Sequence, residues 1–187
     1  MEIGALKKDI GEAIVKASLE VAEGKFDDQF VVDVIQGGAG TSINMNGNEV
    51  IANRAIELLG GEKGDYSIVH PNVHVNMAQS TNDVFPTAIR IACLNIVDDL
   101  LVVLKELRDA FLVKGQEFAG VIKMGRTHLQ DAVPIRLGQE FEAYGAMLTR
   151  DHRRIEEAAK ALLQINMGAT AVGTGLNADP RYIEKVS

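Results

Sequence analysis

The sequence predicts an all-α protein built around long helices. Apolar residues recur every three or four positions along most of the 187 residues, which is the spacing of a helix with one buried face. This spacing is sustained through two long stretches in the second half of the chain, with no alternation of strand and helix patterns. These observations favour packed helices over a fold based on a sheet.

The first part of the chain predicts one helix and a short extended segment. Apolar residues from Ile3 to Val21 follow helical spacing and stop before Gly24. The β-branched run at residues 30–35 then predicts a brief extended segment that leads into a tight turn at Gly37-Gly38.

A second helix is predicted from Ile43 to Leu59. Thr41 or Ser42 is the expected N-cap, because a hydroxyl oxygen accepts hydrogen bonds from the free N–H groups of a first turn. Gly60-Gly61 is the expected stop. The apolar spacing is then lost as far as Asp83, so we expect a structured polar loop there.

Two long helices and the start of another are predicted next. The first runs from about Pro86 to Phe118, with Pro86 in the first turn, where its missing N–H is tolerated. A loop is expected at residues 124–133, and the second long helix, residues 137–162, has the spacing of a bundle seam. Asp179-Pro180 predicts the N-cap and first position of a further helix.

A chain of this length cannot cover both long helices. Each would expose bare apolar surface, and such helices are normally stabilised by packing on other helices. We therefore expect partner helices from other copies of the chain or from sequence outside it, and hence self-association. The expected organisation is a partial N-terminal helical domain over residues 1–82 and a partial helix-bundle domain over residues 83–187.

Composition excludes several classes of protein. With 47% apolar residues, 24% charged residues and a net charge of -7, the chain is typical of a globular protein. No window approaches a membrane span, and an excess of Asp and Glu without Trp argues against a nucleic-acid surface. The single cysteine, Cys93, agrees with a reducing compartment, so we expect a cytoplasmic protein.

Three loops concentrate hydroxyl, amide or imidazole groups ahead of a long helix. They are residues 37–42, 79–83 and 125–131. Helix N-termini offer free N–H groups and a positive dipole end, so converging them makes a pocket suited to a small carboxylate. The alternative is that each loop only caps its helix.

Among the histidines, His128 is the strongest candidate for a catalytic role. It follows Thr127 in a polar loop with Arg126 and Asp131 nearby, where an imidazole can titrate near neutral pH. A structural role in that loop is the alternative.

Cofactor and metal sites are not predicted. Gly38-Ala-Gly40 resembles the start of a dinucleotide fingerprint but has Ile43 where the third glycine belongs. His70 and His74 are four residues apart, but Pro71 disfavours a helix between them and no thiol or acidic partner stands at ligand spacing.

Long motifs identify a family resemblance. Residues 38–49, 79–83 and 124–134 resemble the first and second signature regions of the aspartase/fumarase superfamily, and residues 166–177 are similar to the segment that follows. The wording Ser-Thr-Asn at residues 80–82 looks more like the aspartate ammonia-lyase branch than the fumarase branch, which tends to carry a second Ser in place of Thr81. The resemblance covers essentially the whole chain.

The resemblance implies a fumarase/aspartase-like fold and reversible elimination of ammonia from L-aspartate to give fumarate. It implies that Thr41, Ser80 and Thr81 hold the carboxylate that gains charge. It further implies that Asn82, Thr127 and His128 line the side that binds the amino group, with Thr127 and His128 closest to the chemistry. The substrate would be a small dicarboxylate, and no membrane or nucleic-acid partner is expected.

The resemblance also implies parts that this sequence lacks. Family members carry a loop of the Gly-Ser-Ser-x-Met-Pro-x-Lys-x-Asn kind, whose serine removes the proton, and they assemble each active site from three subunits of a tetramer. Because no such loop occurs here, we expect a fragment without turnover on its own. The alternatives are a fumarate hydratase acting on malate, and a non-catalytic helical assembly module.

Overall fold

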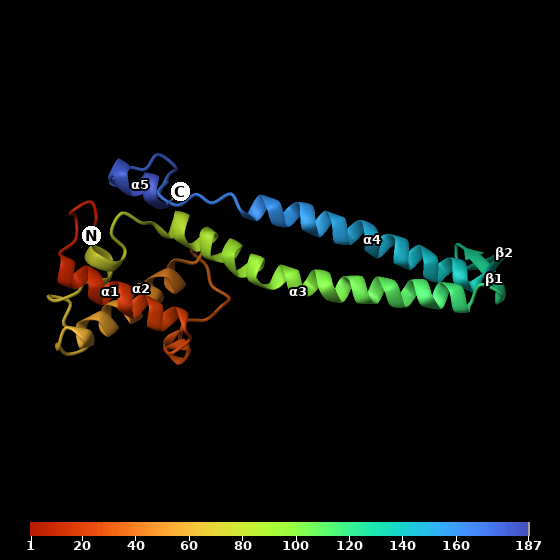
Figure 1. Ribbon diagram of the computed structural model, residues 1–187, viewed down its shortest axis with the longest axis horizontal. Helices are drawn as coiled ribbons and strands as arrows, with labels where there is room; N and C mark the ends of the chain where they lie inside the picture. The colour runs from red at the N-terminus through yellow and green to blue at the C-terminus, as the bar shows by residue number, and fades with distance from the viewer. Residues whose placement is uncertain (187) are drawn as a thin grey trace. The chain divides into compact units, whose positions relative to one another are not determined.

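The computed structural model describes residues 1–186 and is mostly helical, as predicted. It divides into two compact units (Figure 1). One contains Met1–Ile89 and the segment from Ile165 onward, and the other contains Arg90–Gln164. The predicted domain boundary after residue 82 concerns a larger protein and stays a prediction.

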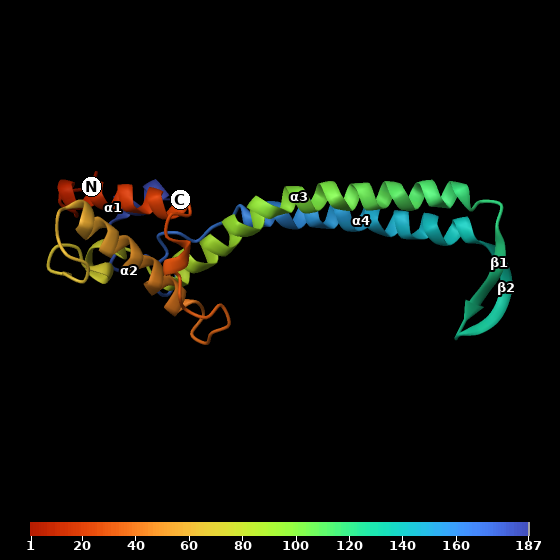
Figure 2. The ribbon, with the colours of Figure 1, turned by 90° about the horizontal axis from the view of Figure 1, so that it is seen from below.

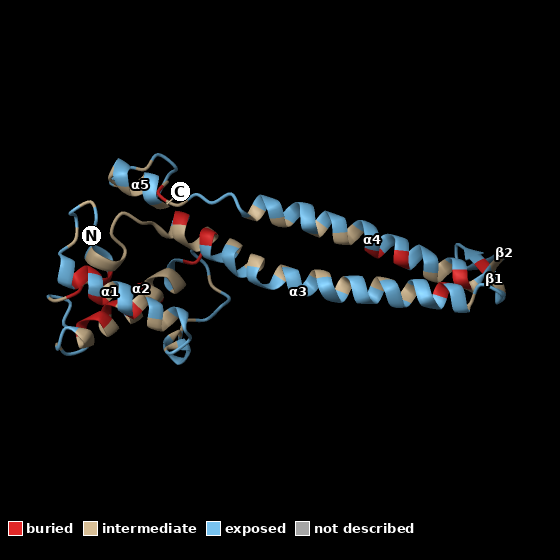
Figure 3. Ribbon diagram, viewed as in Figure 1, coloured by how far each residue is buried: buried red, intermediate tan, exposed pale blue. Residues whose placement is uncertain are grey.

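The core of the first unit lies between helices α1 (Lys8–Ala22) and α2 (Thr41–Leu58). The buried side chains come mainly from small residues, and the helices meet where these lie, as Figure 3 shows. Alanine lets two helix backbones approach closely, so α1 and α2 pack tightly along this face. The buried residues are Ile10, Ala13, Ala17, Ala52, Ala55, Ile56 and Val69.

The extended segment predicted at residues 30–35 is wrong. A 3₁₀ turn, η1 (Asp27–Gln29), is followed by an irregular loop in which Val34 and Ile35 are 84% and 88% exposed. No neighbouring strand lies beside it within the described residues, so its β-branched side chains have no sheet on which to pack.

The N-cap predicted for α2 is also wrong. Gly40 occupies the N-cap with φ of 87°, and Thr41 is the first helical residue. The Thr41 hydroxyl donates to the Gly38 carbonyl at 2.8 Å instead of accepting from the helix. A left-handed cap residue favours glycine, which explains why the chain turns here and not one residue later.

Helix α3 (Thr81–Glu117) begins five residues earlier than predicted. Pro86 therefore lies inside the helix and leaves the carbonyl of Asn82 without its helical N–H donor. Asn166 Nδ2 donates to that carbonyl at 3.0 Å and satisfies it. Before α3, the predicted polar loop contains a single π-helical turn, η2 (Pro71–Val75).

The second unit is an antiparallel pair formed by the later part of α3 and by α4 (Leu137–Leu162), which lie side by side in Figures 1 and 2. The two helices approach closely at glycines, since a Cβ on Gly138 would lie 2.3 Å from the Gly115 carbonyl oxygen. The Phe141 ring contacts the rings of Phe111 and Phe118, with centroids 6.0 and 5.3 Å away. The bounds predicted for α4 are confirmed.

A β-hairpin replaces the loop predicted at residues 124–133. Strands β1 (Ile122–Thr127) and β2 (Gln130–Arg136) pair antiparallel around His128-Leu129, both with positive φ. Two positive φ angles define the tight hairpin turn that normally favours Asn-Gly, so the sequence carries no signal for it. The hairpin is also largely exposed, which removes the alternating pattern of a half-buried strand.

Helix α5 (Pro180–Val186) begins as predicted, with Pro180 at its first position. The Asp179 side chain accepts from the backbone N–H of Arg181 at 2.9 Å, which is an N-cap contact. Within the part of the chain that the structure describes, no helix is both long and apolar enough to cross a membrane.

Candidate functional site

The first turn of α3 is built around Ser80 and Asp83. Ser80 Oγ accepts from the N–H of Asn82 at 3.2 Å, while Asp83 Oδ1 accepts from the N–H of Ser80 at 2.9 Å. This reciprocal arrangement satisfies two N–H groups at the helix start. Because Ser80 Oγ is an acceptor there, its own proton stays available to a ligand.

Asp83 also joins this turn to the segment after α4. Its side chain is fully buried, and its second oxygen accepts from the N–H of Thr170 at 2.9 Å. Asn82 Nδ2 donates to the Ala171 carbonyl at 2.6 Å. Burial and the nearby charge of Asp83 raise the pKa of Tyr182 on α5. Segments about 90 residues apart in sequence are therefore held together by the Asp83 carboxylate and by hydrogen bonds of Asn82.

The first turn of α2 contacts the first turns of α3. Asn44 Nδ2 donates to Thr81 Oγ1 at 2.9 Å. Gly40 packs so closely on the Phe85 ring that a Cβ there would lie 2.3 Å from a ring carbon. The loops around residues 40 and 80 are thus brought together within the first unit.

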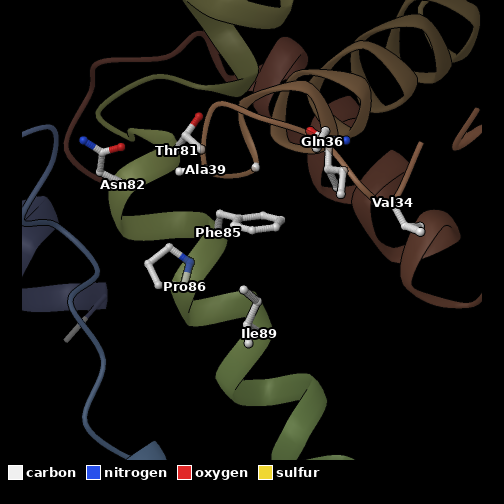
Figure 4. Close-up of a pocket in the computed structure, with 10 residues that line it drawn as sticks. Val34, Gln36, Ala39, Thr81, Asn82, Phe85, Pro86 and Ile89 are labelled. Atoms are coloured by element: carbon white, nitrogen blue, oxygen red, sulfur yellow. The ribbon is translucent and has the colours of Figure 1, made fainter. Parts of the chain in front are cut away.

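A pocket of about 530 Å³ opens at this junction (Figure 4). Thr81 and Asn82 line it from α3, and Gln36 lines it from the loop that faces the Phe85 ring. Gln36 Oε1 is buried and has no hydrogen-bond partner in the described structure. The remaining lining is apolar: Val34, Ala39, Gly40, Ile43, Phe85, Pro86 and Ile89. A few polar groups in an apolar pocket are typical of a small-molecule site.

The candidate residues Thr41 and Ser80 are sequence neighbours of the lining residues Gly40 and Thr81 but do not line the pocket themselves. Thr41 is exposed, and its hydroxyl proton is already donated to Gly38. Among the candidates in the first unit, Thr81 and Asn82 therefore have the most direct access to the pocket.

Thr127 and His128 belong to the second unit, at the tip of the hairpin. Both side chains are exposed, and Arg126 Nε donates to Asp131 Oδ1 at 3.1 Å across the same tip. The expectation that this loop directly precedes a helix is wrong, because β2 intervenes and Arg136 occupies the N-cap of α4. These two residues therefore belong to a different unit from Thr81.

His70 and His74 have structural roles in the loop before α3. His70 Nδ1 accepts from the N–H groups of Asn72 and Val73 at 3.1 and 3.3 Å, and His74 Nδ1 accepts from the N–H of His70 at 2.9 Å. Residues 1–186 contain no cluster of three or more side chains suited to a metal ion.

Sequence reasoning missed the asparagines that surround Thr81. Asn44 and Asn48 lie inside α2, and Asn76 lies in the loop that precedes α3. Asparagine is unfavourable in a helix interior, because its amide competes for backbone hydrogen bonds. The repeated asparagines of residues 44–48 were the signal that could have revealed a polar network.

The chain resembles known proteins throughout. A family model described as lyase matches residues 1–187. Aspartate ammonia-lyases of Bacillus sp and Bacillus subtilis (strain 168) are 65% and 62% identical over the whole chain, which covers 40% and 39% of them. A class II fumarate hydratase of Rhizobium meliloti is 52% identical, and the chain covers 41% of it. The chain thus spans about two fifths of the curated relatives it matches.

Solved structures have the same fold. The cobalt-bound fumarate lyase:delta crystallin of Brucella melitensis is 54% identical with a TM-score of 0.87, and the match covers 98% of this chain and 40% of that one. The class II fumarase of Schistosoma mansoni is 40% identical with a TM-score of 0.83, over 99% of this chain and 39% of that one.

Proposed function

Because this chain belongs to the lyase family of the aspartase/fumarase superfamily, we propose that it carries part of the active site of an aspartate ammonia-lyase. The reaction is the reversible elimination of ammonia from L-aspartate to give fumarate. Identity of 62–65% to two enzymes of that name supports the substrate, and Thr81 supports it within the motif that starts at Ser80.

The observation that carries the proposal is the cluster of polar groups at the start of α3. The Ser80 and Thr81 hydroxyls each accept one hydrogen bond from the protein, which leaves each with a proton to donate. Thr81 and Asn82 line the pocket, and Ser80 precedes them in the sequence. Such fixed donors suit an anionic ligand of small size.

The chemistry explains why donors are needed. A base removes a proton from the carbon next to the side-chain carboxylate, and the electron pair places a second negative charge on that carboxylate. The C–N bond then breaks, the double bond of fumarate forms, and ammonia leaves. Each preorganised donor to the charge that develops is worth about 3 kcal/mol. Ser80 and Thr81 are the residues proposed for this role, and Thr41 would join them once its hydroxyl releases the Gly38 carbonyl.

Thr127 and His128 are proposed for the amino-group side, together with Asn82. Their exposure on a hairpin tip suits residues that act in an assembled oligomer, and a homotetramer is the proposed assembly. Proton abstraction is assigned to no residue of this chain. The proposed compartment is the cytoplasm, in agreement with the single cysteine.

Fumarate hydration is the second candidate function, favoured by the 52% identity to the Rhizobium meliloti enzyme. Its reverse, the dehydration of L-malate, releases water in place of ammonia and uses the same kind of carboxylate stabilisation. The choice between the two is therefore a question of substrate and not of mechanism.

The proposal is tested in an exchange protein, in which this chain replaces the matching 186-residue segment of the Bacillus subtilis relative. Thr127→Ala is expected to lower kcat with L-aspartate by about 10²-fold. Gln130→Ala is the matched control, because Gln130 pairs with Thr127 in the hairpin and is equally exposed. Unchanged activity of the Thr127 variant would instead support a helical assembly module whose polar loops are structural.

A further inference from the structure

Three asparagine side chains form a row between α2 and the loop before α3. Asn44 Nδ2 and Asn48 Nδ2 both donate to Asn76 Oδ1, at 3.4 and 3.1 Å. Asn76 Nδ2 donates in turn to the backbone carbonyl of Gln79, at 3.4 Å. A backbone carbonyl can only accept, so this end of the row fixes which way each amide is turned.

The orientation of the row decides the role of the Thr81 hydroxyl. Since Asn76 presents its oxygen, Asn44 must present its NH₂ group, and the same nitrogen lies 2.9 Å from Thr81 Oγ1. Thr81 Oγ1 is therefore an acceptor toward Asn44, and its own proton must be donated elsewhere.

Within the described residues the Thr81 hydroxyl is seen only as an acceptor, so its proton is free to reach a ligand in the pocket that Thr81 lines. Thr81 lines the pocket of about 530 Å³, whereas Asn44 does not and lines a different hollow, beside Asn48 and Val75. Asn44 therefore approaches the hydroxyl from outside the pocket. Thr41 differs, because its hydroxyl proton is donated to Gly38.

We propose that Asn44 is a positioning residue that sets the Thr81 hydroxyl as a hydrogen-bond donor to a substrate carboxylate. The inference rests on the proposed function, since it requires a carboxylate at Thr81. A hydroxyl that is oriented before the substrate binds does not have to reorient as charge develops, which is the condition under which a donor accelerates a reaction. Asn44 itself does not touch the substrate.

A double-mutant cycle in the exchange protein tests this role. Thr81→Val is expected to lower kcat/KM for L-aspartate by about 10²-fold, with most of the loss in kcat. Asn44→Ala is expected to lower it by about 10-fold when Thr81 is present. In the Thr81→Val background the same Asn44 substitution is expected to change it by less than about 2-fold, because no hydroxyl is left to orient.

The outcomes separate the two proposals. If Asn44→Ala costs the same factor in both backgrounds, Asn44 does not act through Thr81 and the inference is wrong, while the proposed function stands. If Thr81→Val has no effect on kcat/KM, the carboxylate role of Thr81 fails and the inference fails with it.

Two further variants distinguish a specific effect on the Thr81 hydroxyl from a general loss of stability. Asn44→Asp keeps the shape but turns the donor into an acceptor that would take the Thr81 proton, so kcat/KM should fall further than in Asn44→Ala, by about 10²-fold. Asn46→Ala is the matched control on the same helix, because among residues 1–186 the hydrogen-bond partners of the Asn46 side chain are Gln29 and Val31. Its kcat/KM is expected to stay within about 2-fold of the parent. Equal losses in Asn46→Ala and Asn44→Ala would contradict a specific role for Asn44.

Discussion

Gly40 is a residue at which the local backbone and the pocket depend on each other. Its φ of 87° lies in the left-handed region that other residues adopt with strain, and its Cα faces the Phe85 ring. A side chain at this position would have to displace the ring that lines the pocket. The glycine therefore places the start of α2 against α3.

Gly40→Ala is expected to destabilise the protein by about 2–4 kcal/mol, from backbone strain and from overlap with the ring. Gly37→Ala is the control, because Gly37 has no atom within 4 Å of its would-be Cβ and no positive φ. Urea unfolding of the two variants measures the difference. Equal stabilities would show that the Gly40–Phe85 contact is not tight.

Residue-level prediction from sequence was successful where a residue acts through local chemistry. Asp179 was recognised as an N-cap because its carboxylate bonds only two residues ahead. Asp83 was not recognised as a link to Thr170, because that contact joins positions 87 residues apart and leaves no local pattern. The Asn44–Thr81 contact was missed for the same reason.

The start of helix α5 contains a carboxyl group, Asp179, whose pKa is shifted. The Arg181 side chain donates to both Asp179 oxygens, its N–H donates as well, and together they lower the pKa of Asp179 to about 2. The folded-state pKa thus lies below the unfolded value of about 3.9. The contact therefore stabilises the helix start above about pH 4, and this contribution is lost as the pH falls toward 2.

An NMR titration of the Asp179 carboxyl carbon checks this expectation. The midpoint should lie near pH 2 in the parent chain and return toward the ordinary range in Arg181→Gln. A midpoint near 4 in the parent would contradict the ion pair.

The α3–α4 pair depends on the glycines at which its helices approach closely. Gly138→Ala would place a methyl group against the Gly115 carbonyl, with about 1–3 kcal/mol of destabilisation expected. Gly120→Ala is the control, since nothing lies within 4 Å of its would-be Cβ. Thermal unfolding followed by circular dichroism compares them. A Gly138 variant as stable as the Gly120 variant would mean that the helices separate easily at this point.

Elements were predictable in proportion to their apolar periodicity. The sequence predicts α4 at its observed bounds, because its apolar seam is interrupted only by the polar His152. The predicted start of α3 lies five residues too late, because a proline such as Pro86 is typical of a first turn. The Asn166 contact that satisfies the Asn82 carbonyl, and so permits the earlier start, is distant in sequence. The hairpin was missed, because its strands are exposed and its His128-Leu129 turn lacks glycine.

The second unit exposes many apolar side chains. Within α3, Ile96, Val103 and Val113 are 66%, 59% and 61% exposed. Leu100 and Leu107 are also exposed and share a helix face with Ile96 and Val103, and such an exposed apolar stripe indicates an interaction surface.

Self-association is therefore expected. Light scattering should give a mass that is a multiple of 20.2 kDa, and Val103→Asp should lower it. Val31→Asp is the control, because Val31 is 80% exposed but lies in the irregular loop of the first unit. A monomer at all concentrations, or equal effects of both substitutions, would contradict assembly through α3.

The proposed function depends on which substrate the assembled site uses. The most direct measurement is the rate of fumarate formation, followed by its ultraviolet absorbance, when the exchange protein is given L-aspartate or L-malate in parallel. We expect kcat/KM for L-aspartate to exceed that for L-malate by more than about 10²-fold. Preference for L-malate, or no turnover of either substrate by a folded exchange protein, would contradict it.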